Sequence, residues 1–245
     1  MCRMFGYIGY SSDELNLLYT ALVESSRNDV IGKKYGYANH GDGYGIVVYT
    51  KDNLFHFRSS RPIYEEAFKL PEFKGKIFGV FHTMNAHDRS LVSPIFEHPF
   101  TASNGKEVFY MAHNGVVNKQ SIMEYLGING IYNDTEAALQ YIAVKGLSSV
   151  DNLEKYTESS LNLIILHLDK GEEKPEIYFK NFYLDKNKRD YSDMYTVNMP
   201  HGKAIISSTL TRYGIEGGVP ANGTGLINLE SGDPYGITKN FTMKE

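Results

Sequence analysis

Short apolar runs separated by polar turns indicate that β-strands dominate this chain. Residues 45–50 and 53–58 flank Lys51-Asp52, and two such runs around a short polar break predict a β-hairpin. Similar runs predict strands over residues 5–10, 76–82, 108–113, 160–168, 175–183, 204–207 and 224–229.

Helical periodicity is confined to a few segments. Apolar residues recur every three or four positions over 13–25, including Leu15 and Leu18, and Ser12 is a suitable N-cap. Residues 134–145 show the clearest helix pattern, with acids in the first turn, a lysine in the last and a glycine beyond. Paired strands with helices between some of them predict an α+β domain with mostly antiparallel sheets. Shorter helices are predicted over 62–68 and 120–126, and a charged loop over 185–193.

Composition and charge narrow the classes of protein that this sequence can encode. The 245 residues contain no repeat, low-complexity segment or linker, so we expect one domain spanning 1–245. A net charge of −4 without a strongly basic stretch disfavours nucleic acid as a partner. No apolar run reaches the roughly 20 residues that cross a bilayer, and no signal peptide is recognisable. We therefore expect a cytoplasmic protein with no membrane partner.

Cys2 is the single cysteine of the chain. One thiol cannot form an internal disulfide or a multi-cysteine metal site. If Met1 is removed, Cys2 carries both a thiol, with a reference pKa of about 8.5, and a free α-amine at about 7.7–8.0. The amine can then accept the proton of the thiol, which pairs a nucleophile with its own base. The alternative is that a cysteine lies near the N-terminus by chance.

Asn114 and Gly115, which follow the apolar run 108–113, have two interpretations. Acyl transfer needs hydrogen-bond donors at the developing oxyanion, and the Asn114 side chain and the Gly115 backbone N–H are suitable donors. Glycine also permits a close approach of the backbone. The alternative is structural, because Asn-Gly is a preferred pair in two-residue hairpin turns. The dipeptide by itself favours the turn.

The start of the helix predicted over 134–145 also has two interpretations. Asp134 is a suitable N-cap, and acids in a first turn are favoured by the helix dipole. The same carboxylate can hold a substrate ammonium group if the helix start faces a pocket. The two roles are compatible.

Histidines are the remaining candidate ligands. His82, His87 and His98 can cluster if a loop folds back, but they lack the close spacing typical of zinc sites. Isolated histidines on strands are more often hydrogen-bonded core residues. We therefore expect no metal ion.

The chain carries, in this order, the segments 2–9 (CRMFGYIG), 42–45 (DGYG), 93–94 (SP), 98–100 (HPF), 113–115 (HNG) and 133–136 (NDTE). In content and order these segments resemble the class II glutamine amidotransferases, a branch of the N-terminal-nucleophile hydrolases, and in particular their stand-alone type. The resemblance implies a four-layer αββα sandwich of two mostly antiparallel sheets flanked by helices. It implies hydrolysis of glutamine to glutamate and ammonia without a cofactor. The roughly 100 residues after the matching segments are fewer than a further catalytic domain needs, so we expect any ammonia-accepting synthetase to be a separate protein.

The resemblance also assigns roles to individual residues. It implies that Cys2 is the nucleophile and that its α-amine is the base. Asn114, through its side chain, and Gly115, through its backbone N–H, would form the oxyanion hole. Asp134 would hold the ammonium group of the glutamine substrate.

One segment departs from the family pattern. Members carry His-x-Arg-x-Ala-Thr at the end of a core strand, and its arginine binds the substrate α-carboxylate. Here residues 82–87 read HTMNAH, so Met84 replaces the arginine, and methionine cannot form the same paired hydrogen bonds. Each missing charge-assisted bond costs about 1.5–3 kcal/mol, roughly tenfold or more in binding. Arg89, His87 and Arg3 are the candidate replacements.

Three hypotheses follow. The first is a cysteine-nucleophile amidohydrolase that releases ammonia from glutamine or a similar small amide. The second is an N-acyl amide hydrolase of the same superfamily, which fits the loss of the carboxylate-binding arginine. The third is a non-catalytic binding or regulatory protein that keeps the fold. Retention of Met1 would place the Cys2 amine in a peptide bond and exclude the proposed chemistry. Removal of Met1, the true substrate and the oligomeric state are left open by the sequence.

Overall fold

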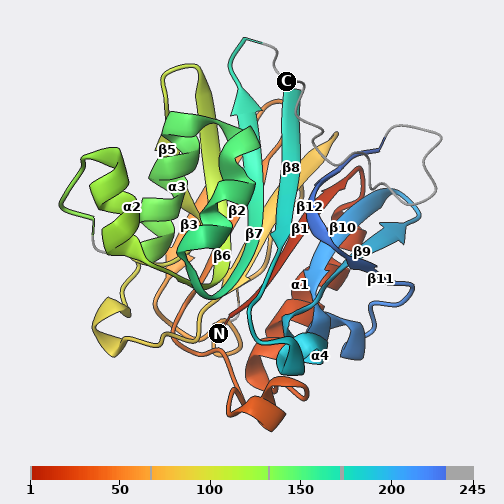
Figure 1. Ribbon diagram of the computed structural model, residues 1–245. Helices are drawn as coiled ribbons and strands as arrows, with labels where there is room; N and C mark the ends of the chain where they lie inside the picture. The colour runs from red at the N-terminus through yellow and green to blue at the C-terminus, as the bar shows by residue number, and fades with distance from the viewer. Residues whose placement is uncertain (1, 67, 132, 172–173, 230–245) are drawn as a thin grey trace.

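The computed structural model describes residues 2–66, 68–131, 133–171 and 174–229. These residues form two antiparallel β-sheets that lie face to face, with helices on their outer sides (Figure 1). Within the described ranges, the first sheet has seven strands in the order β11-β9-β10-β1-β4-β2-β3. The second has five described strands in the order β12-β8-β7-β6-β5.

The strands of the first sheet are β1 (Arg3–Gly9), β2 (Tyr44–Tyr49), β3 (Leu54–Ser59), β4 (Ile77–Thr83), β9 (Met194–Met199), β10 (Gly202–Ser207) and β11 (Val219–Ala221). Those of the second sheet are β5 (Phe100–Ser103), β6 (Glu107–Val117), β7 (Thr157–Asp169), β8 (Lys174–Asn181) and β12 (Gly223–Ile227).

The α-helices of the described residues are α1 (Ser12–Arg27), α2 (Lys119–Leu126), α3 (Asp134–Lys145) and α4 (Arg189–Ser192). Short 3₁₀ helices cover Gly32–Tyr35, Arg89–Leu91, Leu147–Tyr156, Lys186–Lys188 and Ser208–Arg212. In the part of the chain that the structure describes, no helix is both long and apolar enough to cross a bilayer.

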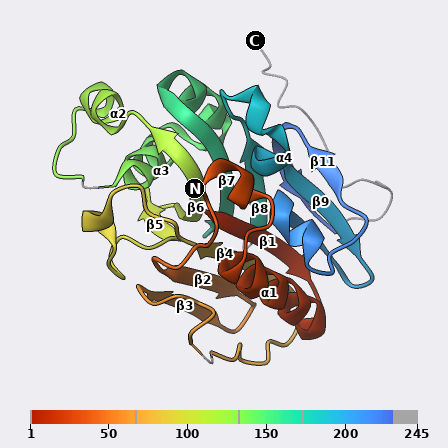
Figure 2. The same cartoon turned by 90° about the horizontal axis from the view of Figure 1, so that it is seen from below.

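Three apolar clusters hold four layers together. One cluster packs α1 against the first sheet, and another packs α2 and α3 against the second. The third fills the space between the two sheets. Viewed from below, α1, the first sheet, the second sheet and α3 follow one another across the molecule (Figure 2). The predicted α+β sandwich of four layers is therefore confirmed.

The central strand β1 shows how the sequence produces these layers. Successive side chains of a strand point to opposite faces. Phe5 and Tyr7 accordingly pack toward α1, whereas Met4 and Ile8 face the second sheet. A Cβ atom at Gly6 would lie 2.8 Å from the Ile164 side chain, so glycine permits the sheets to approach closely there. Because both faces of β1 are buried, its register is strongly fixed.

Two predicted helix features differ from the structure. The segment 62–68 does not form the predicted helix, because its described residues make turns that place the Phe68 ring against Phe57 of β3, with centroids 5.1 Å apart. The N-cap of α1 is Ser11, whose side chain accepts from the Glu14 N–H, whereas the predicted cap Ser12 donates to a backbone carbonyl.

The described part of the C-terminal third contains more secondary structure than the sequence predicts. The predicted loop 185–193 includes a 3₁₀ turn and the short helix α4, stabilised where the Asp185 side chain accepts from the Asn187 N–H and Arg189 pairs with Asp193. The strands β9 and β11 were also not predicted from the pattern of apolar and polar residues. In contrast, α3 has the predicted bounds 134–145, and β2 and β3 form the predicted hairpin.

Candidate active site

The starts of β1 and α3 and the ends of β4 and β6 meet at one end of the sandwich. A cavity of about 730 Å³ opens there. Its lining includes Cys2, Met84, His87, Gly115 and Asp134, which come from segments distant in the sequence. The fold therefore brings four of the six predicted site residues, Cys2, Gly115, Asp134 and His87, to one cavity.

Cys2 and Asn114 are in direct contact across the two sheets. The backbone nitrogen of Cys2 donates to Asn114 Oδ1 at 2.8 Å, and both residues are buried. Because the oxygen of the amide accepts this bond, Nδ2 is the end of the Asn114 side chain that can donate to a substrate. Ser160 Oγ donates to the Asn114 carbonyl oxygen at 2.9 Å and helps to hold this residue in place.

Gly115 lies inside β6 and not in a hairpin turn, so the turn interpretation of the Asn-Gly pair is wrong. It pairs with Leu161 of β7, and the register shifts just beyond it, which indicates a β-bulge. Its φ is 153°, and an added Cβ would lie 1.7 Å from the Ser160 carbonyl oxygen. Only glycine fits this place beside the nucleophile.

Asp134 is the first residue of α3, but it is not its N-cap. Asn133 fills that position, and its side chain accepts from the Thr135 N–H at 2.8 Å. The Asp134 carboxylate instead accepts from the Val117 N–H at 3.0 Å while lining the cavity. This bond ties the start of α3 to the end of β6, next to Gly115.

The thiol of Cys2 lies in a poorly solvated place. Burial raises its pKa above the ordinary value, and the Asn85 backbone N–H and the Arg3 guanidinium act in the opposite direction. A raised pKa keeps the thiol protonated at neutral pH, so nucleophilic attack requires a base close to the sulfur.

The three candidate replacements for the carboxylate-binding arginine lie in different places. His87 lines the cavity. Arg89 forms an ion pair with Asp42, its side chain is 74% exposed, and it is not among the lining residues. Arg3 is fully buried, with its Nε 2.5 Å from Asp29 Oδ2 and its guanidinium 3.7 Å from the centre of the Tyr191 ring. Among the described residues, no arginine lines this cavity.

Met84 occupies the position next to Cys2. Arg3 pairs with Thr83 at the end of the β1–β4 ladder, Cys2 and Met84 are the next residues on the two chains, and both line the cavity. The wall near the nucleophile is therefore a thioether where the family pattern places a guanidinium.

Several lining residues carried no signal in the sequence. Tyr37 lies in a loop, Lys119 begins α2 and Glu158 belongs to β7, yet all three border the cavity. Polar residues in surface segments look alike in a sequence, and only the fold shows which of them face a common space.

Comparisons with known proteins support the architecture. No protein-family model matches the chain, and no similar sequence was found among curated proteins. One similar solved structure is described as the allosteric regulatory enzyme of purine biosynthesis, with a TM-score of 0.63 and 17% identity. The match covers 92% of this chain and 47% of that one, so the chain spans about half of that protein's length. At this identity the likeness shows a shared fold and no more.

Proposed function

We propose that this protein is an amidohydrolase of the glutamine amidotransferase type, with Cys2 as its N-terminal nucleophile. The observation that carries this proposal is the 2.8 Å contact between the Cys2 nitrogen and Asn114 Oδ1 at the edge of a substrate-sized cavity. The fold shared with an enzyme of purine biosynthesis is consistent with it. The chemistry requires removal of Met1, which frees the α-amine.

In the proposed reaction, the α-amine of Cys2 accepts the proton of the thiol. The two groups belong to one residue, and the side-chain oxygen Oδ1 of Asn114 holds the nitrogen in place. Because burial raises the pKa of the thiol, the thiol needs a base to become a thiolate at neutral pH, and the amine of the same residue is that base. The thiolate then attacks the amide carbon of the substrate.

The attack converts the amide carbonyl into an oxyanion. The Nδ2 group of Asn114 and the backbone N–H of Gly115 donate to this oxygen. The ammonium group of Cys2 returns its proton to the amide nitrogen, the C–N bond breaks, and ammonia leaves a thioester on the sulfur. Water, deprotonated by the same amine, hydrolyses the thioester and regenerates the thiol.

Two substrate classes suit the cavity. Asp134 can hold the ammonium group of glutamine, and His87 is the candidate hydrogen-bond partner for its α-carboxylate. The second class is N-acyl amides, which need no carboxylate partner. The observation that favours this alternative is Met84 beside Cys2, in a wall without arginine among the described lining residues.

The first test is intact mass spectrometry of the purified chain before and after incubation with a glutamine-analogue electrophile. We expect a chain without Met1 that gains one adduct, which the Cys2→Ala variant does not form. Retained Met1 in an active preparation contradicts the mechanism. Steady-state assays with glutamine and with a series of N-acyl amides then identify the substrate class; activity on neither class leaves the non-catalytic interpretation.

A further inference from the structure

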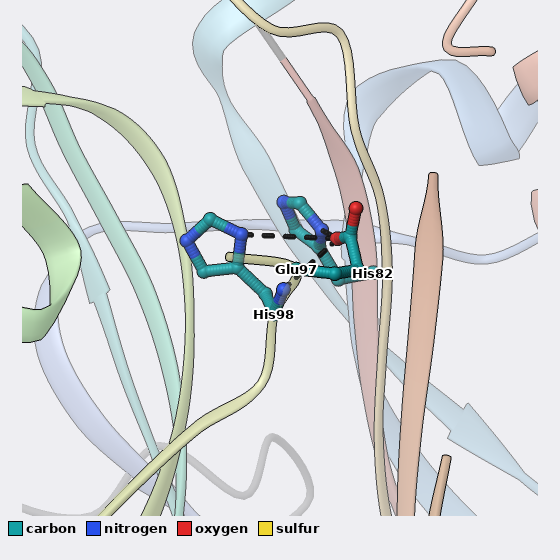
Figure 3. Close-up of side chains that lie close together, drawn as sticks. All are labelled: His82, Glu97 and His98. Atoms are coloured by element: carbon teal, nitrogen blue, oxygen red, sulfur yellow. Dashed lines mark hydrogen bonds and ion pairs between the residues drawn. The ribbon is translucent and has the colours of Figure 1, made fainter. Parts of the chain in front are cut away.

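Three buried side chains meet beside the cavity, where the two sheets come together (Figure 3). His82 belongs to β4 of the first sheet, whereas Glu97 and His98 lie just before β5 of the second. His82 Nδ1 is 2.8 Å from Glu97 Oε1, and His98 Nδ1 is 3.9 Å from the same oxygen. All three residues are at least nine-tenths buried.

Hydrogen bonds on the far side of His98 fix which of its ring nitrogens carries the proton. His113 Nε2 lies 3.1 Å from the Ser160 carbonyl oxygen, which can only accept, so this nitrogen is a donor. In a neutral ring whose Nε2 carries the proton, Nδ1 is the acceptor. Thr135 Oγ1, at 3.0 Å, therefore donates its proton to that nitrogen.

The direction of this bond continues to His98. Since the Thr135 hydroxyl donates to His113, its oxygen accepts from His98 Nε2, which lies 2.9 Å away. The other nitrogen of His98, Nδ1, then presents a bare lone pair, and it has no hydrogen-bond partner among the described residues. That lone pair faces Glu97 Oε1, which already accepts from the His98 backbone N–H at 2.9 Å. Two electron-rich atoms thus face each other at 3.9 Å in a buried space, and His82 Nδ1 lies 2.8 Å from the same carboxylate oxygen.

We propose that His82 Nδ1, His98 Nδ1 and Glu97 Oε1 bind a divalent cation of the Zn²⁺ class. Zinc binds imidazole and carboxylate ligands at about 2.0–2.2 Å in a tetrahedron, so its ligand atoms lie roughly 3.3–3.5 Å apart. The observed separations of 2.8 and 3.9 Å bracket that value, and the three atoms lie within 4.8 Å of one another. His98 also lines the cavity, from which a water can complete the coordination.

The surroundings of His98 are those of a metal ligand. Ligating histidines usually donate their second ring nitrogen to a neighbouring oxygen, which fixes the tautomer and orients the ring. Thr135 does this here. The ion would join the two sheets beside Cys2 and stabilise the fold there. This proposal rests on the geometry of the cluster and does not depend on the proposed function.

The site was not expected from the sequence, which predicts no metal ion. His82 and His98 are 16 positions apart, and Glu97 matched no motif. His87, which the sequence grouped with the two histidines, lines the cavity and is not part of the cluster.

The test is calorimetric titration of the chelator-treated full chain with Zn²⁺, with Co²⁺ absorption as a report of coordination geometry. We expect one ion per chain, a tetrahedral Co²⁺ spectrum and a higher unfolding temperature with metal. Glu97→Gln should weaken Zn²⁺ binding about 100-fold or more. Thr135→Val keeps all three ligands but frees the His98 tautomer, and it should weaken binding about 10–100-fold.

Two control variants keep the outcome clear. His167→Gln changes a histidine that pairs with Glu107 at 2.9 Å outside the cluster, and it should bind Zn²⁺ like the original chain. Cys2→Ala should also retain the ion. Three results would each overturn the proposal: loss of Zn²⁺ binding in Cys2→Ala, equal binding by Glu97→Gln and the original chain, or no binding by the original chain. In the last case, a proton on Glu97 hydrogen-bonds to the facing histidine nitrogen in place of a metal ion. Folding of every variant is checked by circular dichroism.

Discussion

The two walls of the cavity are built in different ways. Cys2, Asn114 and Gly115 lie on or beside central strands, where packing on both faces and the sheet register fix the backbone. Another part of the wall is formed by the loop 84–91, which follows β4 and contains mostly half-buried or exposed residues. Residues that suit acyl transfer are thus held by the core, whereas Met84 and His87, which border the space for a substrate, lie on a loop.

Contacts with the segment 39–43 hold the loop wall, including two hydrogen bonds between the backbone of Met84 and residues 42 and 43. The Ala86 N–H donates to Asp42 Oδ2 at 2.9 Å, and Arg89 pairs with the other oxygen of that carboxylate. We infer that substrate choice changes more readily than the chemistry in this architecture, and the following variants test that difference.

The largest effect is expected at the nucleophile. Cys2→Ala should lower kcat on the order of 10⁴-fold or more, because no other described side chain can form the thioester. Circular dichroism should show an unchanged fold, since only one buried sulfur is removed. Substantial turnover by the variant on any amide would contradict the proposed mechanism.

Removal of the Asn114 side chain should be the next most severe change. Loss of one oxyanion donor lowers kcat about 10²–10³-fold with little change in KM. Asn114→Ala also releases the Cys2 nitrogen from its 2.8 Å contact. A change confined to KM would show that Asn114 binds substrate and does not stabilise the oxyanion.

Acid should lower the free energy of unfolding through His40, which is linked through Asp29 to Arg3 at the start of β1. Its ring bonds to Asp29, which also binds Arg3, and burial lowers its pKa to about 4. The unfolded chain, with a histidine pKa of about 6.5, binds a proton that the folded chain excludes, so stability falls as pH drops from 6.5 to 4. The loss is roughly 3 kcal/mol.

Urea unfolding between pH 7 and pH 4 measures this loss. His40→Gln should be less stable at pH 7, and its free energy of unfolding should fall less steeply, by up to about 1.4 kcal/mol per pH unit. Other buried histidines, His82, His98 and His113, also have lowered pKa values and keep part of the slope. An unchanged slope in His40→Gln would show that His40 is not the responsible group.

Gly115→Ala should lower the free energy of unfolding by more than the roughly 1–3 kcal/mol of a strained backbone, because the new Cβ meets the Ser160 carbonyl. Gly105→Ala is the matched control: its φ is 89°, but no atom lies within 4 Å of the added Cβ. Thermal unfolding of the two variants separates the steric contribution from the backbone preference. Equal losses would mean that β6 can shift to make room.

The smallest expected change is improved binding of glutamine by a variant in the loop 84–91. Met84→Arg introduces a guanidinium beside Cys2 and should lower KM for glutamine about tenfold or more, while activity on N-acyl amides falls. Arg89→Ala should change neither value by more than about twofold, because its side chain is exposed and paired with Asp42. A large loss on glutamine in Arg89→Ala would show that the loop moves to bring Arg89 to the substrate.

Prediction from the sequence succeeded where a local pattern and the tertiary packing agree. The helix 134–145 has its charges, its last-turn lysine and its terminal glycine in the expected places, and it forms with those bounds. The segment 62–68 has a helix-compatible start, but a helix this short is only marginally stable by itself. Its described residues instead allow the Phe68 ring to stack on Phe57. Asn114-Gly115 has the composition of a turn, but pairing with β7 extends the strand through it.

By itself, the sequence determined the strand-rich composition, the clearest helix and the single residue that can act as both nucleophile and base. These features follow from side-chain periodicity and from the chemistry of one residue, so neighbours along the chain are sufficient. Only the tertiary structure decided that Cys2 contacts Asn114, that Arg3 and Arg89 have other partners, and that His82, Glu97 and His98 meet. Such contacts join residues from different strands and loops, and their distances depend on how two sheets pack, which no local pattern encodes.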